Sequence, residues 1–413
     1  MKKLLLLFML LFTLQTQASH LMGGQMTSRN IGGLTYEVTL TLYRDTLGIP
    51  MYATEDIHYN DLVSFTVLHT LPYTNMINIG NGVEKYEYID TITFPTPGKY
   101  RAYTENCCRN AAIINIPNAG GYGMYLDVDI YADSTNSSPV FLNEPITVAQ
   151  LNQPFSYNPL PYDVDGDSLS WVLDSPYDVG AWLIPGYVLP FSDTLSPFQM
   201  DPLTGEITFI PNTIGNFQVS VKAIEWRNGV QIGYIRRDMQ LIVVPSGNTP
   251  INVQVGTTVQ RNTTNPIYIN VGESLTFEMT TFDVDNGPVS VTPSGSVFLS
   301  SNPATVVANT PIQNGYSTII SWTPTLNDVS SDPYYLSFRV GEFYYPFTFY
   351  NDYTFRIIVT NTTTGLNEVI SPKNEVYLIK TVDILGREID KDSSGLKIYC
   401  YSDGTTKKIY QMK

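Results

Sequence analysis

Short segments of the chain alternate apolar and polar residues, and this period of two constrains the fold more than any other feature. In LTYEVTLTLY (34–43), leucine, tyrosine and valine side chains fall on one face and mainly threonine and glutamate on the other, as in a half-buried β-strand. The alternation recurs at 123–131, 217–224 and 335–340. After residue 18, no helical periodicity extends over more than two turns. We therefore expect an all-β chain of tandem β-sandwiches.

Two central blocks of the sequence form a repeat. Linker-like segments rich in Pro, Ser, Thr and Asn separate the groups of strands, at 133–139, 245–250 and 360–365. Between these linkers, Asp163 matches Asp283 after 120 residues, and Glu225 matches Glu342 after 117 residues. Nearly constant offsets indicate one module that occurs twice. With about seven strands in roughly 110 residues, such a module has the size of an immunoglobulin-like domain.

These boundaries predict five parts. They are a signal peptide at 1–18, an N-terminal β-sandwich at 19–133, a first immunoglobulin-like or cadherin-like module at 139–245, a second, diverged module at 250–360, and a small C-terminal β domain at 366–413.

The first residues have the pattern of a secretory signal. Lys2 and Lys3 precede an apolar run from Leu4 to Leu14, and small or polar residues follow up to Ala18. The run is too short to span a bilayer, so we expect cleavage near Ser19. No later stretch is apolar for long enough to be a transmembrane segment. The protein is therefore expected to be exported to the cell surface or the medium.

Two acidic loops are candidate calcium sites. YDVDGDSLSW (162–171) places carboxylates on alternate positions, and FDVDNGPVSV (282–291) repeats the pattern in part. Oxygen-rich loops of this kind bind calcium, although the glycine is misplaced for an EF-hand, and the alternative is a solvated turn. The candidate ligands within the loops are Asp163, Asp165, Asp167, Asp283 and Asp285.

Charge and motif content argue against nucleic-acid binding and catalysis. The net charge of −15 repels phosphate backbones and can attract divalent cations. The only histidines are His20, His58 and His69, and the usual hydrolase, phosphate-loop and zinc motifs are absent. We therefore predict no catalytic residue and no obligatory cofactor, with calcium the one candidate. A glycosidase built from two carboxylates is the catalytic alternative.

Aromatic residues suggest where a ligand would bind. Trp182 and Trp226 lie near predicted loops and are candidate ligand contacts. The aromatic segment at 342–355 is either a binding surface or, as we expect, a hairpin whose rings pack in the core and across strands. The adjacent Cys107 and Cys108 form either a vicinal disulfide or two free thiols.

The first repeat resembles the cadherin-like and polycystic-kidney-disease-like modules of bacterial surface proteins. The resemblance rests on DVDGDSLSW (163–171), MDPLTGEITFIP (200–211) and FQVSVKAIE (217–225). The second repeat retains only part of this signature. The resemblance implies a modular surface protein, in which further acidic residues join the loop carboxylates around calcium. Glu144 or Glu225 is the candidate for that further ligand of the first loop.

The N-terminal block resembles the opening of large gliding-associated surface proteins of the Bacteroidota. The similar segments are SHLMGGQMTSRNIGGLTYEVTLTLYRD (19–45), NCCRN (106–110) and NSSPVF (136–141). Those proteins usually carry a cysteine where this chain has Thr46.

The C-terminus resembles the type A sorting domain of the type IX secretion system. The matching residues are Asp383, Gly386, Arg387, Asp403, Gly404, Lys407 and Lys408. The resemblance implies export by that machinery, with the lysine pair as a recognition feature. Alternatively, the two lysines protect the edge of a sheet.

Together these features predict a non-catalytic exported protein for adhesion or structural display. The expected partners are the type IX secretion machinery and an unidentified surface polysaccharide or protein. The alternative is a secreted glycan-binding protein or an accessory module of a polysaccharide hydrolase system.

Overall fold

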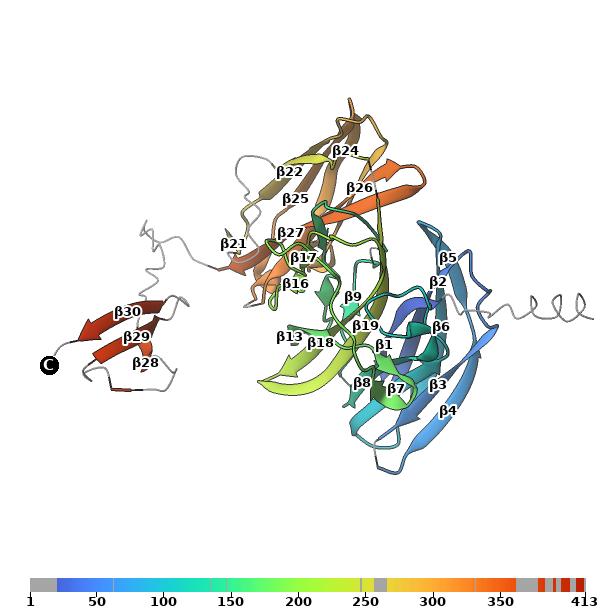
Figure 1. Ribbon diagram of the computed structural model, residues 1–413. Helices are drawn as coiled ribbons and strands as arrows, with labels where there is room; N and C mark the ends of the chain where they lie inside the picture. Colours follow the sequence, from blue (N-terminus) through green and yellow to red (C-terminus); the bar gives the residue numbers. More distant parts are fainter. Residues whose placement is uncertain are drawn as a thin grey trace, which may run out of the picture. The chain divides into compact units, whose positions relative to one another are not determined.

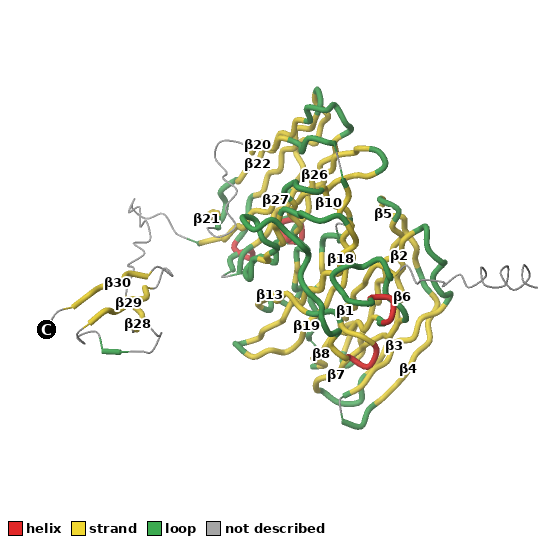
Figure 2. The backbone as a smooth tube through the Cα atoms, viewed as in Figure 1, coloured by secondary structure: helices red, strands yellow, loops and turns green. Residues whose placement is uncertain are grey.

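A computed structural model of the chain describes residues 21–361 except 62, 134, 146, 246, 256–265 and 331, and then 378–382, 389–390, 395–401 and 406–411. The chain divides into two compact units, Met1–Asn361 and Thr362–Lys413. Almost all of the regular structure is strand, as predicted (Figures 1 and 2). None of the helices in the described ranges is long and apolar enough to cross a membrane. The predicted signal peptide lies outside the described residues.

The N-terminal block is a sandwich of two four-stranded sheets. Its strands are β1 (Leu21–Gly32), β2 (Thr35–Asp45), β3 (Thr54–Asn60), β4 (Thr66–Pro72), β5 (Asn75–Gly80), β6 (Val83–Thr93), β7 (Gly98–Asn106) and β8 (Met124–Ala132). The sheet orders are β1-β2-β6-β5 and β8-β7-β3-β4. Val38 and Leu40 of one sheet share a buried cluster with Tyr59 and Leu126 of the other. The predicted alternation therefore supplies the inward face of each sheet.

The middle block is built around one long hairpin. Its elements, with the short helix that precedes β8, are η1 (Ala119–Gly121), β9 (Val140–Phe141), β10 (Val148–Gln150), β11 (Phe155–Tyr157), β12 (Pro161–Tyr162), β13 (Ser168–Asp174), β14 (Tyr177–Asp178), η2 (Val179–Ala181), β15 (Trp182–Leu183), β16 (Gln199–Met200), β17 (Ile207–Phe209), β18 (Gly215–Arg227) and β19 (Val230–Val244). Asn228 and Gly229 join β18 to β19, and both have positive φ. A two-residue hairpin turn of this twist requires that conformation, which explains the Asn-Gly sequence.

Strand β19 connects the first two blocks into one sheet (Figure 1). Along its length, Tyr234 lies opposite Asp129 of β8, Met239 opposite Gly23 of β1, and Ile242 beside Val148 of β10. Both sheets of the N-terminal sandwich therefore end on the same strand of the middle block. The predicted blocks 19–133 and 139–245 share a continuous 12-stranded sheet and a continuous hydrophobic cluster.

The third block is a separate sandwich of two four-stranded sheets. Its elements are β20 (Asn252–Val255), β21 (Ile267–Asn270), β22 (Leu275–Phe282), β23 (Val289–Ser294), η3 (Ser296–Leu299), β24 (Thr305–Ile312), β25 (Gly315–Trp322), η4 (Leu326–Asp328), β26 (Tyr334–Tyr344) and β27 (Phe347–Thr360). The sheet orders are β20-β22-β25-β24 and β21-β27-β26-β23. Phe277, Trp322 and Phe338 belong to its own core. In the aromatic hairpin, Phe349 and Phe355 are buried, whereas Tyr345 is exposed at the tip.

The middle and third blocks share an internal arrangement. In each, a short strand pairs in parallel with the last long strand, β10 with β19 and β21 with β27. The neighbouring pairs also correspond, because β13 pairs with β18 as β23 pairs with β26. These equivalent positions bring the two acidic loops into matching environments.

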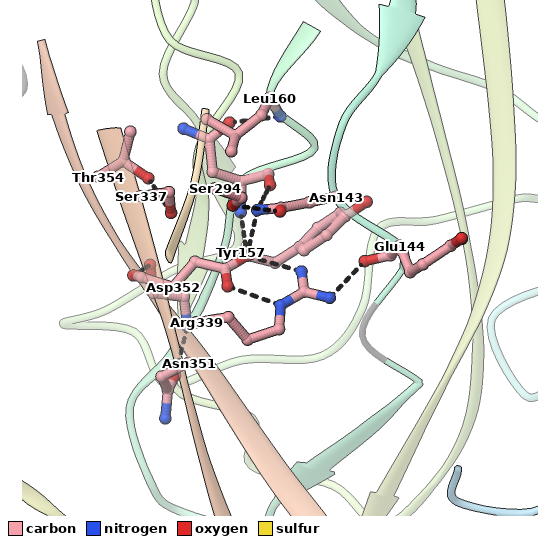
Figure 3. A network of polar contacts seen from close by, with 12 residues as sticks. Asn143, Glu144, Tyr157, Leu160, Ser294, Ser337, Arg339, Asn351, Asp352 and Thr354 are labelled. Atoms are coloured by element: carbon pink, nitrogen blue, oxygen red, sulfur yellow. Dashed lines mark hydrogen bonds and ion pairs between the residues drawn. The ribbon is translucent and has the colours of Figure 1, made fainter. Parts of the chain in front are cut away.

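Buried polar contacts attach the third block to the middle block. The Arg339 guanidinium binds the Asp352 carboxylate and donates to the carbonyl of Glu144 at 2.8 Å (Figure 3). Asp352 Oδ2 also accepts a hydrogen bond from the backbone of Asn158 at 3.0 Å. A charged pair of the third block thus holds two backbone groups of the middle block.

The C-terminal unit contains a three-stranded antiparallel sheet. Its strands are β28 (Leu378–Val382), β29 (Gly395–Tyr401) and β30 (Thr406–Gln411). Lys407 and Lys408 lie on β30 opposite Tyr399 and Ile398. The remaining predicted sorting residues lie outside the described residues, and they are Asp383, Gly386, Arg387, Asp403 and Gly404.

Candidate metal sites at two module junctions

The first acidic loop folds around Asp163. Its Oδ1 accepts hydrogen bonds from the backbone N–H groups of Asp165 at 2.9 Å and Asp167 at 3.0 Å. This turn leaves Asp163 Oδ2 buried and, within the described part of the chain, without a hydrogen-bond partner. An unpaired buried carboxylate oxygen is costly unless a cation or a proton compensates it.

Glu225 of β18 faces the same point. It is fully buried, and neither carboxylate oxygen makes a hydrogen bond with acceptable geometry to any described residue. Gly233 lies opposite on β19, where a Cβ atom would come within 2.7 Å of Glu225 Oε2. The glycine therefore leaves the space that the carboxylate occupies. One oxygen each from Asp163, Asp167 and Glu225 lies within 4.8 Å of the others, and we call this group junction site 1.

The electrostatics of junction site 1 favour a bound cation or a proton. Burial and, next, the charge of Asp163 raise the pKa of Glu225 to about 9. The Asn136 amide lowers this pKa in part, although its geometry falls short of a hydrogen bond. Burial also raises the pKa of Asp163 to about 6. Near neutral pH, Glu225 alone would therefore hold a proton that a divalent cation has to displace.

The loop also holds the linker between the first two blocks. Asp165 Oδ2 accepts a hydrogen bond from the backbone of Ser137 at 2.6 Å, so Asp165 contacts the linker rather than joining the three-carboxylate group. Arg227 binds Asp167 at 2.5 Å and Asp133 at 3.0 Å. A change at junction site 1 therefore reaches the linker directly.

The second repeat forms an equivalent group, junction site 2, from Asp283, Asp285 and Glu342. Asp283 is fully buried, and its Oδ1 accepts a hydrogen bond from the backbone of Asp285 at 2.8 Å. Asp285 Oδ2 accepts another from the backbone of Thr249, in the second linker, at 2.6 Å. Burial raises the pKa of Glu342 to about 7, and its Oε1 has no hydrogen-bond partner among the described residues.

The donor atoms of both sites suit a hard cation. Each group consists of carboxylate oxygens, which are preferred ligands of calcium, and contains neither the thiolate nor the imidazole that a zinc site would use. The orphaned oxygens of Asp163, Glu225 and Glu342 provide unused coordination. Site 1 would hold its ion through Asp163, Asp167 and Glu225, and site 2 through Asp283, Asp285 and Glu342.

The sequence named five of these six residues as candidate ligands, four loop aspartates and Glu225. Of its two candidates for a further acid, Glu225 lies at junction site 1, whereas Glu144 binds Tyr43 at 2.6 Å and Lys85 at 2.8 Å. Glu342 was not named as a ligand. Its alignment with Glu225 in the repeat was the signal that pointed to it.

The remaining predicted site residues lie elsewhere. Trp182 is 73% exposed on β15, so its ring is accessible to a ligand. Trp226 is half-buried, and its Nε1 donates to Ser170 Oγ at 2.8 Å. The structure joins Cys107 and Cys108 in a vicinal disulfide.

Comparisons with known proteins give structural neighbours only. No family model and no curated protein matches the sequence. The structural matches include the eight N-terminal immunoglobulin domains of Down syndrome cell adhesion molecule, with 10% identity, 82% of this chain and 37% of that chain covered, and a TM-score of 0.19. A chimeric titin Z1Z2 tandem matches at 13% identity, with 54% of this chain and 99% of that chain covered and a TM-score of 0.17.

A third match is the sialic acid-binding region of a Streptococcus sanguinis SK1 adhesin, bound to 3'sLn. It has 12% identity, 67% of this chain and 97% of that chain are covered, and the TM-score is 0.19. At these TM-scores, residues do not correspond in space, so no residue role is transferred to this chain.

Proposed function

We propose that this chain is an exported, non-catalytic surface or secreted protein that serves adhesion or structural display, and that divalent cations stiffen its two module junctions. The observation that carries the proposal is the shared composition of the two junction sites. Each pairs two loop aspartates with a buried strand glutamate, and an aspartate of the same loop, Asp165 or Asp285, binds the preceding linker. Display at a surface needs such fixed junctions, because a flexible linker would let each module reorient.

Calcium is the cation that this proposal names. Three carboxylates whose oxygens lie within 4.8 Å of one another repel each other, and a divalent ion replaces that repulsion with attraction. Calcium tolerates irregular oxygen sites, and it is supplied outside the cell at concentrations that weak sites can use. Binding at either site would immobilise the loop that holds Ser137 or Thr249 of the linker.

Thermal unfolding of the mature chain tests the calcium proposal. At 100-fold excess over Kd, a ligand of the folded state adds about 2.7 kcal/mol, so calcium should raise the melting temperature by several degrees relative to EDTA. In the double variant Glu225→Gln, Glu342→Gln, this rise should disappear, while the melting temperature in EDTA should increase because the cost of either protonating or burying two ionised carboxyl groups is removed. Glu278→Gln changes an exposed glutamate on β22 and should behave as the unmodified protein. An equal calcium response in the double variant would refute the assignment.

Export by a type IX-like route is the second element of the proposal. Its support is the predicted signal peptide and the similarity of residues 366–413 to a type A sorting domain. The type IX machinery is then a partner, and the location is the cell surface or the medium.

A secreted glycan-binding protein, or an accessory module of a polysaccharide hydrolase system, is the second candidate function. The observation that favours it is an aromatic and hydroxyl-lined cleft beside junction site 1.

A further inference from the structure

We infer that the cleft between the acidic loop of the middle block and the third block binds a neutral oligosaccharide. The cleft has a volume of about 530 Å³, within the range of small-ligand sites. One wall is formed by residues 161–171 with Leu203, and the other by η3, η4 and the start of β26. This inference rests on the second function proposed above and gives that function a site and a ligand class.

Tyrosine residues line both walls of the cleft. Tyr162 comes from the middle block and Tyr334 from the third, and both are partly exposed. Aromatic faces stack on the apolar C–H faces of sugar rings, and each wall therefore offers a ring for such stacking.

Contacts across the cleft fix its width. Tyr335 donates through its hydroxyl to the carbonyl of Leu203 at 3.2 Å, and Ser168 Oγ donates to Asp332 Oδ2 at 3.2 Å. Both hydrogen bonds join the middle block to the third. The walls are therefore held together before a ligand arrives, which lowers the entropy cost of binding.

The polar groups of the third-block wall match a polyhydroxylated ligand. Ser300, Ser301 and Ser330 line the cleft, together with Asn327. Hydroxyl and amide groups both donate and accept hydrogen bonds, as sugar hydroxyls do. Ser301 is pre-oriented by a 2.9 Å hydrogen bond to Asp328 Oδ1. The wall thus offers fixed, uncharged hydrogen-bonding groups rather than mobile surface side chains.

The charges that line the cleft disfavour an anionic ligand. Its aspartates outnumber the single basic residue Arg356, so sialylated or sulfated glycans are repelled; they are Asp163, Asp165, Asp167, Asp328 and Asp332. A neutral sugar avoids this repulsion and can still accept from the arginine and donate to the carboxylates. A lysine-rich peptide is the competing occupant, which the binding test separates from a sugar.

Binding assays on the mature full-length chain test the inference. Neutral oligosaccharides, sialylated oligosaccharides and a lysine-rich peptide are each titrated by calorimetry in calcium-containing buffer. We expect binding in the neutral set only, and at least a tenfold loss of affinity in Tyr162→Ala, which removes one stacking face. Tyr268→Ala is the matched control, because Tyr268 is an exposed tyrosine of the third block that does not line the cleft.

A second variant keeps the test valid if Tyr162→Ala unfolds. Leu203 is 57% exposed in the cleft lining, so Leu203→Trp should fill the cleft without disturbing a core and should also weaken binding at least tenfold. Absence of neutral-sugar binding, selective binding of the sialylated sugar or the peptide, or unchanged affinity in Leu203→Trp would each overturn the inference. The calcium-dependent melting experiment is done without a sugar. A negative sugar titration therefore does not refute the proposed cation sites, and an absent calcium response does not refute sugar binding.

Discussion

Glu225 and Glu342 place carboxylates where an apolar side chain would stabilise a β-module more. Each lies on a long strand of its sandwich, is almost fully buried and has an oxygen without a hydrogen-bond partner in the described ranges. Buried strand positions normally carry apolar or fully hydrogen-bonded side chains. Because both modules depart from this at equivalent positions, the two glutamates indicate a function for which the modules give up stability. The raised pKa values of both carboxyl groups reflect the cost of burying an unpaired charge, because burial favours the protonated form over the ionised form.

Stability should therefore depend on pH more strongly without the cation than with it. The folded-state pKa values of Asp163, Glu342 and Glu225 are about 6, 7 and 9, above the ordinary values near 4. The folded state then binds more protons than the unfolded state between about pH 4 and pH 9, so stability falls as the pH rises through this window. In EDTA, the melting temperature should decrease from pH 5 to pH 9.

Saturating calcium should reduce this decrease, because the ion holds the carboxylates in their charged form. The double variant Glu225→Gln, Glu342→Gln should show a flatter profile in EDTA than the unmodified protein. A melting temperature in EDTA that stays level or rises over the same range would contradict the assigned protonation of these groups.

At the scale of elements, the sequence predicted strands and turns better than it predicted strand pairing. Alternation marks a strand locally, and Asn228-Gly229 marks the turn between β18 and β19. The pairing of β19 with β1, β8 and β10 joins residues about 90 to 215 positions apart, and no local pattern encodes it. The same limit applies to the metal sites: the loop aspartates are recognisable from spacing, whereas the strand glutamates join them only through tertiary pairing.

The Arg339–Asp352 pair shows how an element-level contact joins two blocks. The two residues lie on neighbouring strands, with the Asp352 side chain fully buried and the Arg339 side chain 15% exposed, and Asp352 also holds the backbone of Asn158 in the middle block. Arg339→Met should leave the Asp352 charge uncompensated and lower the free energy of unfolding by about 3 to 5 kcal/mol. Urea denaturation of the mature chain measures this loss.

An exposed pair serves as the matched control for that variant. Arg29 and Glu37 form an ion pair at 2.9 Å, with side chains 64% and 32% exposed. Arg29→Met should change the free energy of unfolding by no more than about 1 kcal/mol, since exposed pairs contribute little. Equal losses in Arg29→Met and Arg339→Met would mean that the buried pair does not hold the junction.

At the scale of the whole molecule, the described part of Met1–Asn361 behaves as connected blocks rather than independent ones. A shared sheet joins the first two blocks, the Arg339 network joins the third, and Asn81 of the N-terminal block bonds Thr348 of the third at 2.7 and 2.8 Å. The net charge of −15 then keeps such a body away from other polyanions and concentrates cations near its acidic loops. Connected blocks of this kind can carry the Tyr162–Tyr334 cleft as a preformed site.

The separate C-terminal unit leads to the last prediction. Since Thr362–Lys413 is compact on its own, deleting 366–413 should leave the melting temperature of the remaining protein unchanged while it abolishes export across the outer membrane. In a bacterium with a type IX system, the truncated protein should accumulate in the periplasm, as measured by protease accessibility on intact cells. The variant Lys407→Ala, Lys408→Ala separates recognition from edge protection, because it keeps the β30 backbone that pairs with β29. If recognition uses the lysines, this variant also stays in the periplasm; normal surface display of the truncated protein would show that residues 366–413 carry no sorting signal.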